Sequence, residues 1–98
     1  MKEIGMKFDD DKVRLDLIPA KAELELGKVL TFGAKKYAPN SWQNVDNGID
    51  RYIAAAMRHI NAMRQGEVND AESGLSHASH AACNMMFVTE LTALKGGE

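Results

Sequence analysis

The chain has 98 residues, which suits a single small domain over residues 1–98. A domain of this size buries only about 60–65% of its unfolded surface, so we expect association with further copies to complete its core. The net charge of −2 argues against binding long nucleic acid, because such proteins usually carry a basic excess. A small anion in a local basic pocket remains compatible with this charge.

Cysteine usage and hydropathy indicate neither a secreted nor a membrane protein. The single cysteine, Cys83, excludes an internal disulfide framework. Its Ala-rich surroundings predict a small buried hydrophobe rather than a reactive thiol. No apolar run has the length of a signal-peptide core or a membrane span. We therefore expect a cytoplasmic protein that does not bind membranes.

Residues 1–17 are polar and charged. Val13, Leu15 and Leu17 alternate with polar residues, and this period of two predicts an extended arm, either an edge strand or a segment laid over a neighbour. The aspartates at positions 9–11 are expected to form a solvated turn, with metal ligation as the alternative.

Three helices are predicted, at residues 19–36, 48–65 and 76–94. Pro19 suits the start of the first, and Asn47 suits the N-cap of the second. Gly66 should end the second helix, and Ser76 should cap the third. Apolar residues recur at helical spacing in each segment. With short loops and little strand, these signals predict an all-α fold, a three-helix bundle completed by oligomerisation.

The most chemically loaded stretch lies between Gly66 and Asn84. His77, His80 and Asn84 fall at i, i+3 and i+7, on one side of a helix. Three acids come just before them: Glu67, Asp70 and Glu72. Imidazoles with carboxylates suit a divalent ion such as Mg, Mn or Zn, which can bridge phosphate oxygens and position a water for attack. Asn84 would orient a bound ligand.

A purely structural interpretation remains open for the same residues. Histidines on a helix facing a core often pack there, with the second ring nitrogen bonded to a carbonyl. Asp70 has an alternative as a turn or capping residue, and Glu72 as a solvated side chain.

Other residues could extend this site. If the second and third helices are antiparallel neighbours, His59 approaches the start of the third helix. Arg58 and Arg51, two turns apart, could meet phosphates, although surface arginines are an equal alternative. Lys36 and Tyr37 end the first helix, and Trp42 follows closely. This combination could hold a phosphate by charge and a base by stacking, but it is not a Walker loop.

Three blocks carry a family resemblance: RLDLIP, VLTFGAKKYAPNSW and RHINAMRQGEVNDAESGLSHASHAACN. Together they resemble a family of phage and prophage proteins, the dATP/dGTP diphosphohydrolase N-terminal-like family, related to MazG-type all-α nucleotide pyrophosphohydrolases. The resemblance covers about residues 7–94. It matches the family at these positions: Lys36, Tyr37, Asn40, Trp42, Arg58, His59, Gly66, Glu67, Asp70, Glu72, Ser73, Gly74, His77, His80 and Asn84.

The resemblance implies hydrolysis of a purine dNTP to the monophosphate and pyrophosphate. The roles of the matched positions are our own inference from their chemistry, with Mg or Mn as the expected cofactor. Residues that would hold the ion are Glu67, Asp70, His77 and His80. Glu72 or His59 would be the base. Residues that would bind the substrate are Lys36, Tyr37, Asn40, Trp42, Arg58 and Asn84. MazG-like helices assemble as dimers or tetramers, and a phage-encoded chain would act in the host cytoplasm.

One departure from the MazG pattern bears on catalysis. MazG-type enzymes hold magnesium with E-x-x-E on one helix and E-x-x-D on a later one. Here Glu23 and Glu25 are two apart, and His77-x-x-His80 stands where a carboxylate pair is expected. The alternative function is therefore a non-catalytic phage protein that binds or sequesters nucleotides and so blocks nucleotide-based immune signalling. A purely structural oligomer is the third option.

Overall fold

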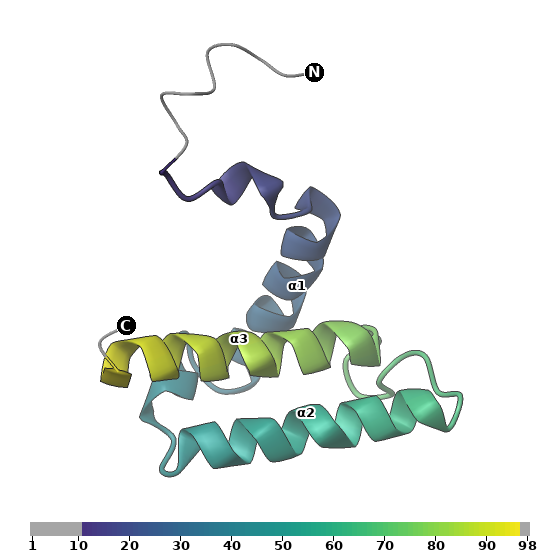
Figure 1. Cartoon of the computed structure of the whole chain (residues 1–98). Helices are drawn as coiled ribbons and strands as arrows, with labels where there is room; N and C mark the ends of the chain where they lie inside the picture. Colours follow the sequence, from purple (N-terminus) through teal and green to yellow (C-terminus); the bar gives the residue numbers. More distant parts are fainter. Residues whose placement is uncertain (1–10, 97–98) are drawn as a thin grey trace, which may run out of the picture.

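The computed structural model describes residues 11–96, which are all-α as predicted. The elements in chain order are a 3-10 turn η2 (Leu15–Leu17), α1 (Ala20–Lys36), a 3-10 turn η3 (Ser41–Asn44), α2 (Gly48–Arg64) and α3 (His77–Gly96). Each α-helix begins and ends within two residues of its predicted bounds. Helices α2 and α3 lie side by side and antiparallel, whereas α1 crosses near α3 and rises away from the pair (Figure 1).

A 3-10 turn occupies Leu15–Leu17, where the sequence predicts an extended arm. Arg14 binds both carboxylate oxygens of Asp16 at 2.8 Å, and an ion pair across two positions bends the backbone. The described residues place no strand beside this segment, so extended backbone would lack hydrogen-bond partners. The rest of the predicted arm, including Asp9 and Asp10, lies outside the described residues, and Asp11 is exposed.

The predicted helix boundaries have clear local causes. Ser76 caps α3, because its Oγ accepts a hydrogen bond from Ser79 N at 3.0 Å. Gly66 follows α2 with φ of +96°, a left-handed conformation that favours glycine. Asn47 occupies the N-cap position of α2, but its side chain makes no capping hydrogen bond.

Small residues let α2 and α3 approach closely. Among residues 11–96, the buried apolar residues are Ala56, Ala81 and Cys83. A Cβ at Gly48 would lie 3.4 Å from Leu91 Cδ1, so this position has little room for a side chain. Cys83 is 1% exposed, which confirms the predicted small buried hydrophobe. Burial raises the pKa of its thiol to about 11, so the thiolate is scarce at neutral pH.

An aromatic group fastens the loop after α1 to the α2–α3 pair. The Trp42 ring stacks on Phe87, with centroids 4.5 Å apart and planes 14° apart. Tyr52 lies 4.9 Å from Phe87, and its hydroxyl donates to the Trp42 carbonyl at 2.7 Å. These contacts join η3, α2 and α3 and so position the segment between α1 and α2.

Large apolar side chains remain on the outside of the molecule. Along α2 they form a stripe at helical spacing: Ile53, Met57, Ile60 and Met63. In the part of the chain that the structure describes, no helix is both long and apolar enough to cross a membrane. Exposed apolar surface of this kind is typical of contacts between proteins, and the oligomer stays a prediction.

Candidate functional site

The segment between α2 and α3 is a tightly bonded loop rather than a loose connection. Asp70 N donates to Leu75 O at 2.8 Å, and Gly74 N donates to Asp70 O at 2.8 Å. His77 N reaches Val68 O at 2.9 Å, and Asn69 pairs with Ser76 in an isolated bridge. These bonds hold the loop over the start of α3, so its side chains have defined positions.

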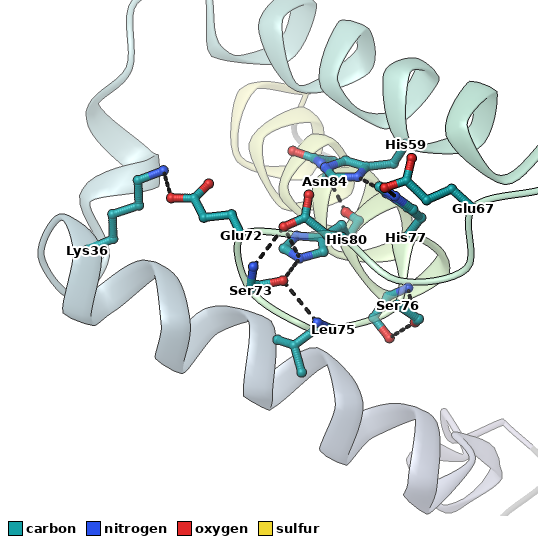
Figure 2. A network of polar contacts seen from close by, with 12 residues as sticks. Lys36, His59, Glu67, Glu72, Ser73, Leu75, Ser76, His77, His80 and Asn84 are labelled. Atoms are coloured by element: carbon teal, nitrogen blue, oxygen red, sulfur yellow. Dashed lines mark hydrogen bonds and ion pairs between the residues drawn. The ribbon is translucent and has the colours of Figure 1, made fainter. Parts of the chain in front are cut away.

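All three histidines of the chain converge beside this loop. His59 Nδ1 lies 2.8 Å from His77 Nδ1, which joins α2 to α3. The His59 ring also stacks on His80, with centroids 4.7 Å apart and planes 10° apart. His59 therefore contacts both histidines of α3 (Figure 2). We call His59, Asp70, His77 and His80 the His/Asp cluster.

Carboxylates approach the cluster from the loop. An oxygen of Asp70 accepts a hydrogen bond from Ser73 N at 2.9 Å and lies 4.0 Å from His80 Nε2. Ser73 Oγ is 2.7 Å from the same His80 nitrogen. A Glu67 oxygen lies 3.4 Å from His77 Nε2, a buried nitrogen without a hydrogen-bond partner among the described residues. Asp70 thus has the predicted turn role and also faces the imidazoles.

Lowered pKa values favour neutral His59 and His80 rings beside an ionised Asp70. Partial burial lowers the pKa of His59, helped by the nearby His80 and His77. Burial also lowers the pKa of His80, more than Asp70 raises it. Burial acts to raise the pKa of Asp70, but hydrogen bonds from Ser73 and the adjacent histidines hold it below the ordinary value. Neutral imidazoles and a carboxylate are the forms that bind metal ions.

The cluster has the spacing needed for a metal ion. One ligand atom from each of His59, Asp70 and His77 lies within 4.8 Å of the other two. Two imidazole nitrogens and a carboxylate oxygen are a common donor set for divalent transition metals. The residues present therefore fit a metal ion, and His59 joins them, although we expected a base there from the sequence.

An open groove of about 1220 Å³ leads to the cluster between α1, the segment after it, α2 and α3. Its volume exceeds the roughly 300–1,000 Å³ of typical ligand pockets, so a nucleotide has room. All six predicted substrate-binding residues line this groove: Lys36, Tyr37, Asn40, Trp42, Arg58 and Asn84. His59, Asp70, Glu72 and His80 also line it, whereas Glu67 and His77 are not among its lining residues.

Several lining residues already have partners. Lys36 Nζ forms an ion pair with Glu72 at 2.6 Å (Figure 2), and this carboxylate, with Tyr37, raises the pKa of Lys36. Asn84 donates its amide to His80 O at 2.9 Å, within its own helix. One face of Trp42 is covered by Phe87, so a base could stack only on the other face.

Sequence reasoning gave little weight to two contributions to this site. Ser73, matched only as a family position, links Asp70 to His80 through its backbone and hydroxyl. The sequence does not single out Tyr52, yet its hydroxyl donates to the Trp42 carbonyl and so holds the groove wall that carries Trp42. The S-G pair at Ser73 and Gly74 does signal a turn. No local signal indicates the contact of Tyr52, because its partner lies in another element.

Comparison with known proteins now gives the chain a family. Residues 2–97 match the sequence profile of the family described as dATP/dGTP diphosphohydrolase, N-terminal. A relative named dATP/dGTP diphosphohydrolase, from Salmonella phage PMBT28, is 38% identical over 84 residues, which is 86% of this chain. The chain spans 28% of that relative's length. No solved structure matches it. On its sequence, the chain belongs to the dATP/dGTP diphosphohydrolase N-terminal family.

Proposed function

We propose that this chain binds a purine deoxynucleoside triphosphate in the groove and, with a divalent metal ion, hydrolyses it to the monophosphate and pyrophosphate. The observation that carries the proposal is the groove, because basic residues and members of the His/Asp cluster line it together. The name of the phage relative supplies the nucleotide and the type of reaction. In the balanced reaction, water attacks the α-phosphorus and the bond to the bridging oxygen breaks, which releases pyrophosphate.

The basic wall would bind the phosphates. Arg51, Arg58 and Lys36 line the groove, and guanidinium groups bind phosphate oxygens in pairs. The exposed sides of Trp42 and Tyr37 would hold the base by stacking. Asn40 lines the same groove and would contact the base there. Asn84 keeps its side-chain oxygen available, because only its amide group is bonded.

The Lys36–Glu72 ion pair suggests how a base is made available. A triphosphate carries more charge than one carboxylate, so it would draw Lys36 away from Glu72. The released carboxylate could then take a proton from the attacking water. Binding and activation would thus depend on the same exposed pair.

The His/Asp cluster would hold the metal ion near the phosphates. A bound divalent ion neutralises phosphate charge and lowers the pKa of a coordinated water. The chain's own contribution is to keep His59 neutral, through burial, and Asp70 ionised, through the hydrogen bonds from Ser73.

A nucleotide screen tests the proposal. The protein is incubated with each of the four dNTPs, ATP and GTP, with Mn²⁺, Mg²⁺ or a chelator, and pyrophosphate and monophosphate are measured. Metal-dependent release of both products from dATP or dGTP is expected. Retention of an intact purine nucleotide without turnover would contradict hydrolysis and favour a sequestering protein.

Lys36→Gln provides a matched variant for the phosphate-binding step. Because Lys36 is exposed on α1, its replacement should leave folding intact. We expect KM for the nucleotide to rise about tenfold, since one charge-assisted phosphate contact is lost. Lys28→Gln, which removes an exposed lysine paired with Glu25 on the same helix, is the control and should leave KM unchanged. Equal KM values for both variants would remove Lys36 from the site.

A further inference from the structure

We propose that His59 and His77, each through Nδ1, and Asp70, through its carboxylate, form a site for one first-row transition-metal ion. This site deepens the proposed function, but it can be tested without nucleotide. It differs from the ligand set predicted from the sequence, which contains Glu67 and His80 and leaves out His59. The three ligands come from α2, the loop and α3, and their ligand atoms lie within 4.8 Å of one another.

The two Nδ1 atoms face one another across 2.8 Å. Without an ion, one must carry the proton and the other accept it. Two nitrogens bound to one ion at 2.0–2.1 Å lie about 2.9–3.4 Å apart. A small opening of the pair, by a few tenths of an ångström, would therefore let both lone pairs meet an ion. Asp70 would supply the third ligand from the loop side.

Glu67 stands behind His77 rather than beside the ion. Its oxygen lies 3.4 Å from Nε2, the ring nitrogen that points away from His59. Metal-binding histidines usually donate their other N–H to a carboxylate or carbonyl, which orients the ring and strengthens the bond to the metal. His77 Nε2 is buried and has no hydrogen bond in the described chain, so a proton there suits the Glu67 carboxylate. Glu67 is thus a positioning residue.

His80 has a supporting role as well. Its Nε2 is engaged with Ser73 Oγ at 2.7 Å, and its ring lies flat on His59. Ser73 in turn holds Asp70 through its backbone N–H at 2.9 Å. His80 therefore steadies two ligands, one by stacking and one through Ser73, and it is not part of the group of close ligand atoms.

The donor set predicts which ions bind. Mg²⁺ prefers oxygen ligands and keeps several waters, whereas imidazole nitrogens favour transition metals. General affinity rises from Mn²⁺ through Co²⁺ to Ni²⁺, and imidazole also suits Zn²⁺. Two histidines and one carboxylate leave further positions open for water or a phosphate oxygen. The loop bonds that fix Asp70 and His77 hold these two ligands in place before an ion arrives.

Metal titration of the full chain tests the site. After chelator treatment, Co²⁺, Zn²⁺, Mn²⁺ and Mg²⁺ are titrated by calorimetry, and Co²⁺ binding is also followed by its visible spectrum. One ion per chain is expected, with Co²⁺ and Zn²⁺ binding at least 100-fold more tightly than Mg²⁺. Mg²⁺ binding as tightly as Zn²⁺ would overturn the assignment.

Variants separate ligands from supporting residues. Asp70→Asn keeps an oxygen for Ser73 N, and His59→Asn alters a partly exposed position, so both should fold; circular dichroism checks this. Each should weaken Co²⁺ binding at least 100-fold and change its spectrum. Glu67→Gln should weaken binding about tenfold with an unchanged spectrum. His80→Gln should also keep the spectrum, and a changed spectrum there would make His80 a ligand.

The outcomes also separate this site from the proposed function. Transition-metal binding without pyrophosphate release would leave the site standing and reject the hydrolase. Metal-dependent pyrophosphate release, together with unchanged Co²⁺ binding in Asp70→Asn and His59→Asn, would reject this site and leave the hydrolase standing.

An independent observation, the exposed stripe on α2, carries a second inference: the structure assigns this face to a second copy of the chain. Met57, at the middle of the stripe, is 64% exposed, and Ile53 and Ile60 lie on either side of it. Asp50 and Arg64 each lie seven positions from Met57, which is two helical turns in opposite directions. An antiparallel pairing of two α2 helices about Met57 therefore sets Asp50 beside Arg64 of the second copy, twice.

This self-complementary arrangement is what a two-fold interface requires. Apolar side chains occupy its centre and opposite charges its two ends, and both ends match by symmetry. The buried apolar residues of the described chain are small, and a contact across this face would add the larger side chains of α2 to the core.

Light scattering during size exclusion tests the interface. The wild-type chain should run as a dimer. Met57→Glu places like charges at the two-fold axis and should yield monomer, whereas Ala93→Glu, at an exposed position of α3, should not. Asp50→Arg should weaken the dimer at least tenfold, and the double variant Asp50→Arg, Arg64→Asp should restore it. A monomeric wild type, or a double variant no better than Asp50→Arg, would overturn the inference.

Discussion

The α2–α3 pair and helix α1 are held in different ways. Small residues join α2 to α3 along a close interface, and the His/Asp cluster crosses it at one end. Helix α1 contacts α3 and the loop before it through its C-terminal part: the Phe32 and His80 rings are nearly perpendicular with centroids 6.5 Å apart, and Lys36 pairs with Glu72 of the loop. Its Leu24 remains 60% exposed. The proposed metal ligands thus come from α2, α3 and the loop between them, while α1 supplies a groove wall with few contacts.

Of the changes that test this difference between the two regions, the largest loss of stability is expected in the aromatic group of Trp42, Tyr52 and Phe87. Phe87→Ala removes the stack with Trp42 and the contact with Tyr52, and should lower the free energy of unfolding by about 2–3 kcal/mol, less than for a fully buried site. Urea denaturation measures this. Phe32→Ala, the corresponding change on α1, should have a clearly smaller effect. An equal loss in both variants would break the distinction between the two regions.

A smaller effect is expected from pH. His59 and His80 have lowered pKa values in the folded chain, mainly through burial, so the unfolded chain binds protons more readily. Below the ordinary histidine pKa of about 6.5, the metal-free protein should therefore lose stability as the pH falls. Asp70, with its lowered pKa, adds a further loss only near pH 4 and below. Urea midpoints at pH 7.5, 6.5 and 5.5 should decrease in order.

Replacing the histidines sharpens the same prediction. The pH dependence between 7.5 and 5.5 should be weaker in His80→Gln, because one of the shifted groups is gone. A wild-type midpoint that is constant over this range would show that the imidazoles titrate as they do in the unfolded chain.

The smallest effect concerns the exposed surface of α1. Leu24→Gln should change the free energy of unfolding by no more than about 0.5 kcal/mol, since the side chain is largely in water. Thermal denaturation measures it. A loss above about 1.5 kcal/mol would mean that this face of α1 is covered in solution.

Local signals predicted much of the fold. Pro19, Gly66 and Ser76 mark helix boundaries through backbone chemistry that acts within one turn, so the structure confirms the bounds closely. The prediction of an extended arm is wrong at Leu15–Leu17, because the alternation of apolar and polar residues is a weak signal over so few residues. An ion pair between Arg14 and Asp16, visible only in three dimensions, accompanies the turn there.

The sequence predicted which histidines come together at the candidate site, but not how their rings are oriented. Spacing on one helix brought His77 and His80 together, and the antiparallel prediction brought His59 near them. Which nitrogen faces which partner depends on ring orientations, and these follow from contacts with Ser73 and Glu67 in the loop. Sequence spacing carries no information on such orientations, so the ligand set that it suggested and the one proposed from the structure differ.

The most direct test of the central claim is pyrophosphate release from dGTP in the presence of Mn²⁺, compared between the wild-type chain and Asp70→Asn. Glu90→Gln, an exposed change far along α3, serves as the matched control. We predict release by the wild type and the control, and a loss of at least 100-fold in Asp70→Asn with its fold retained. Equal release by all three proteins would contradict a metal-assisted site at the His/Asp cluster.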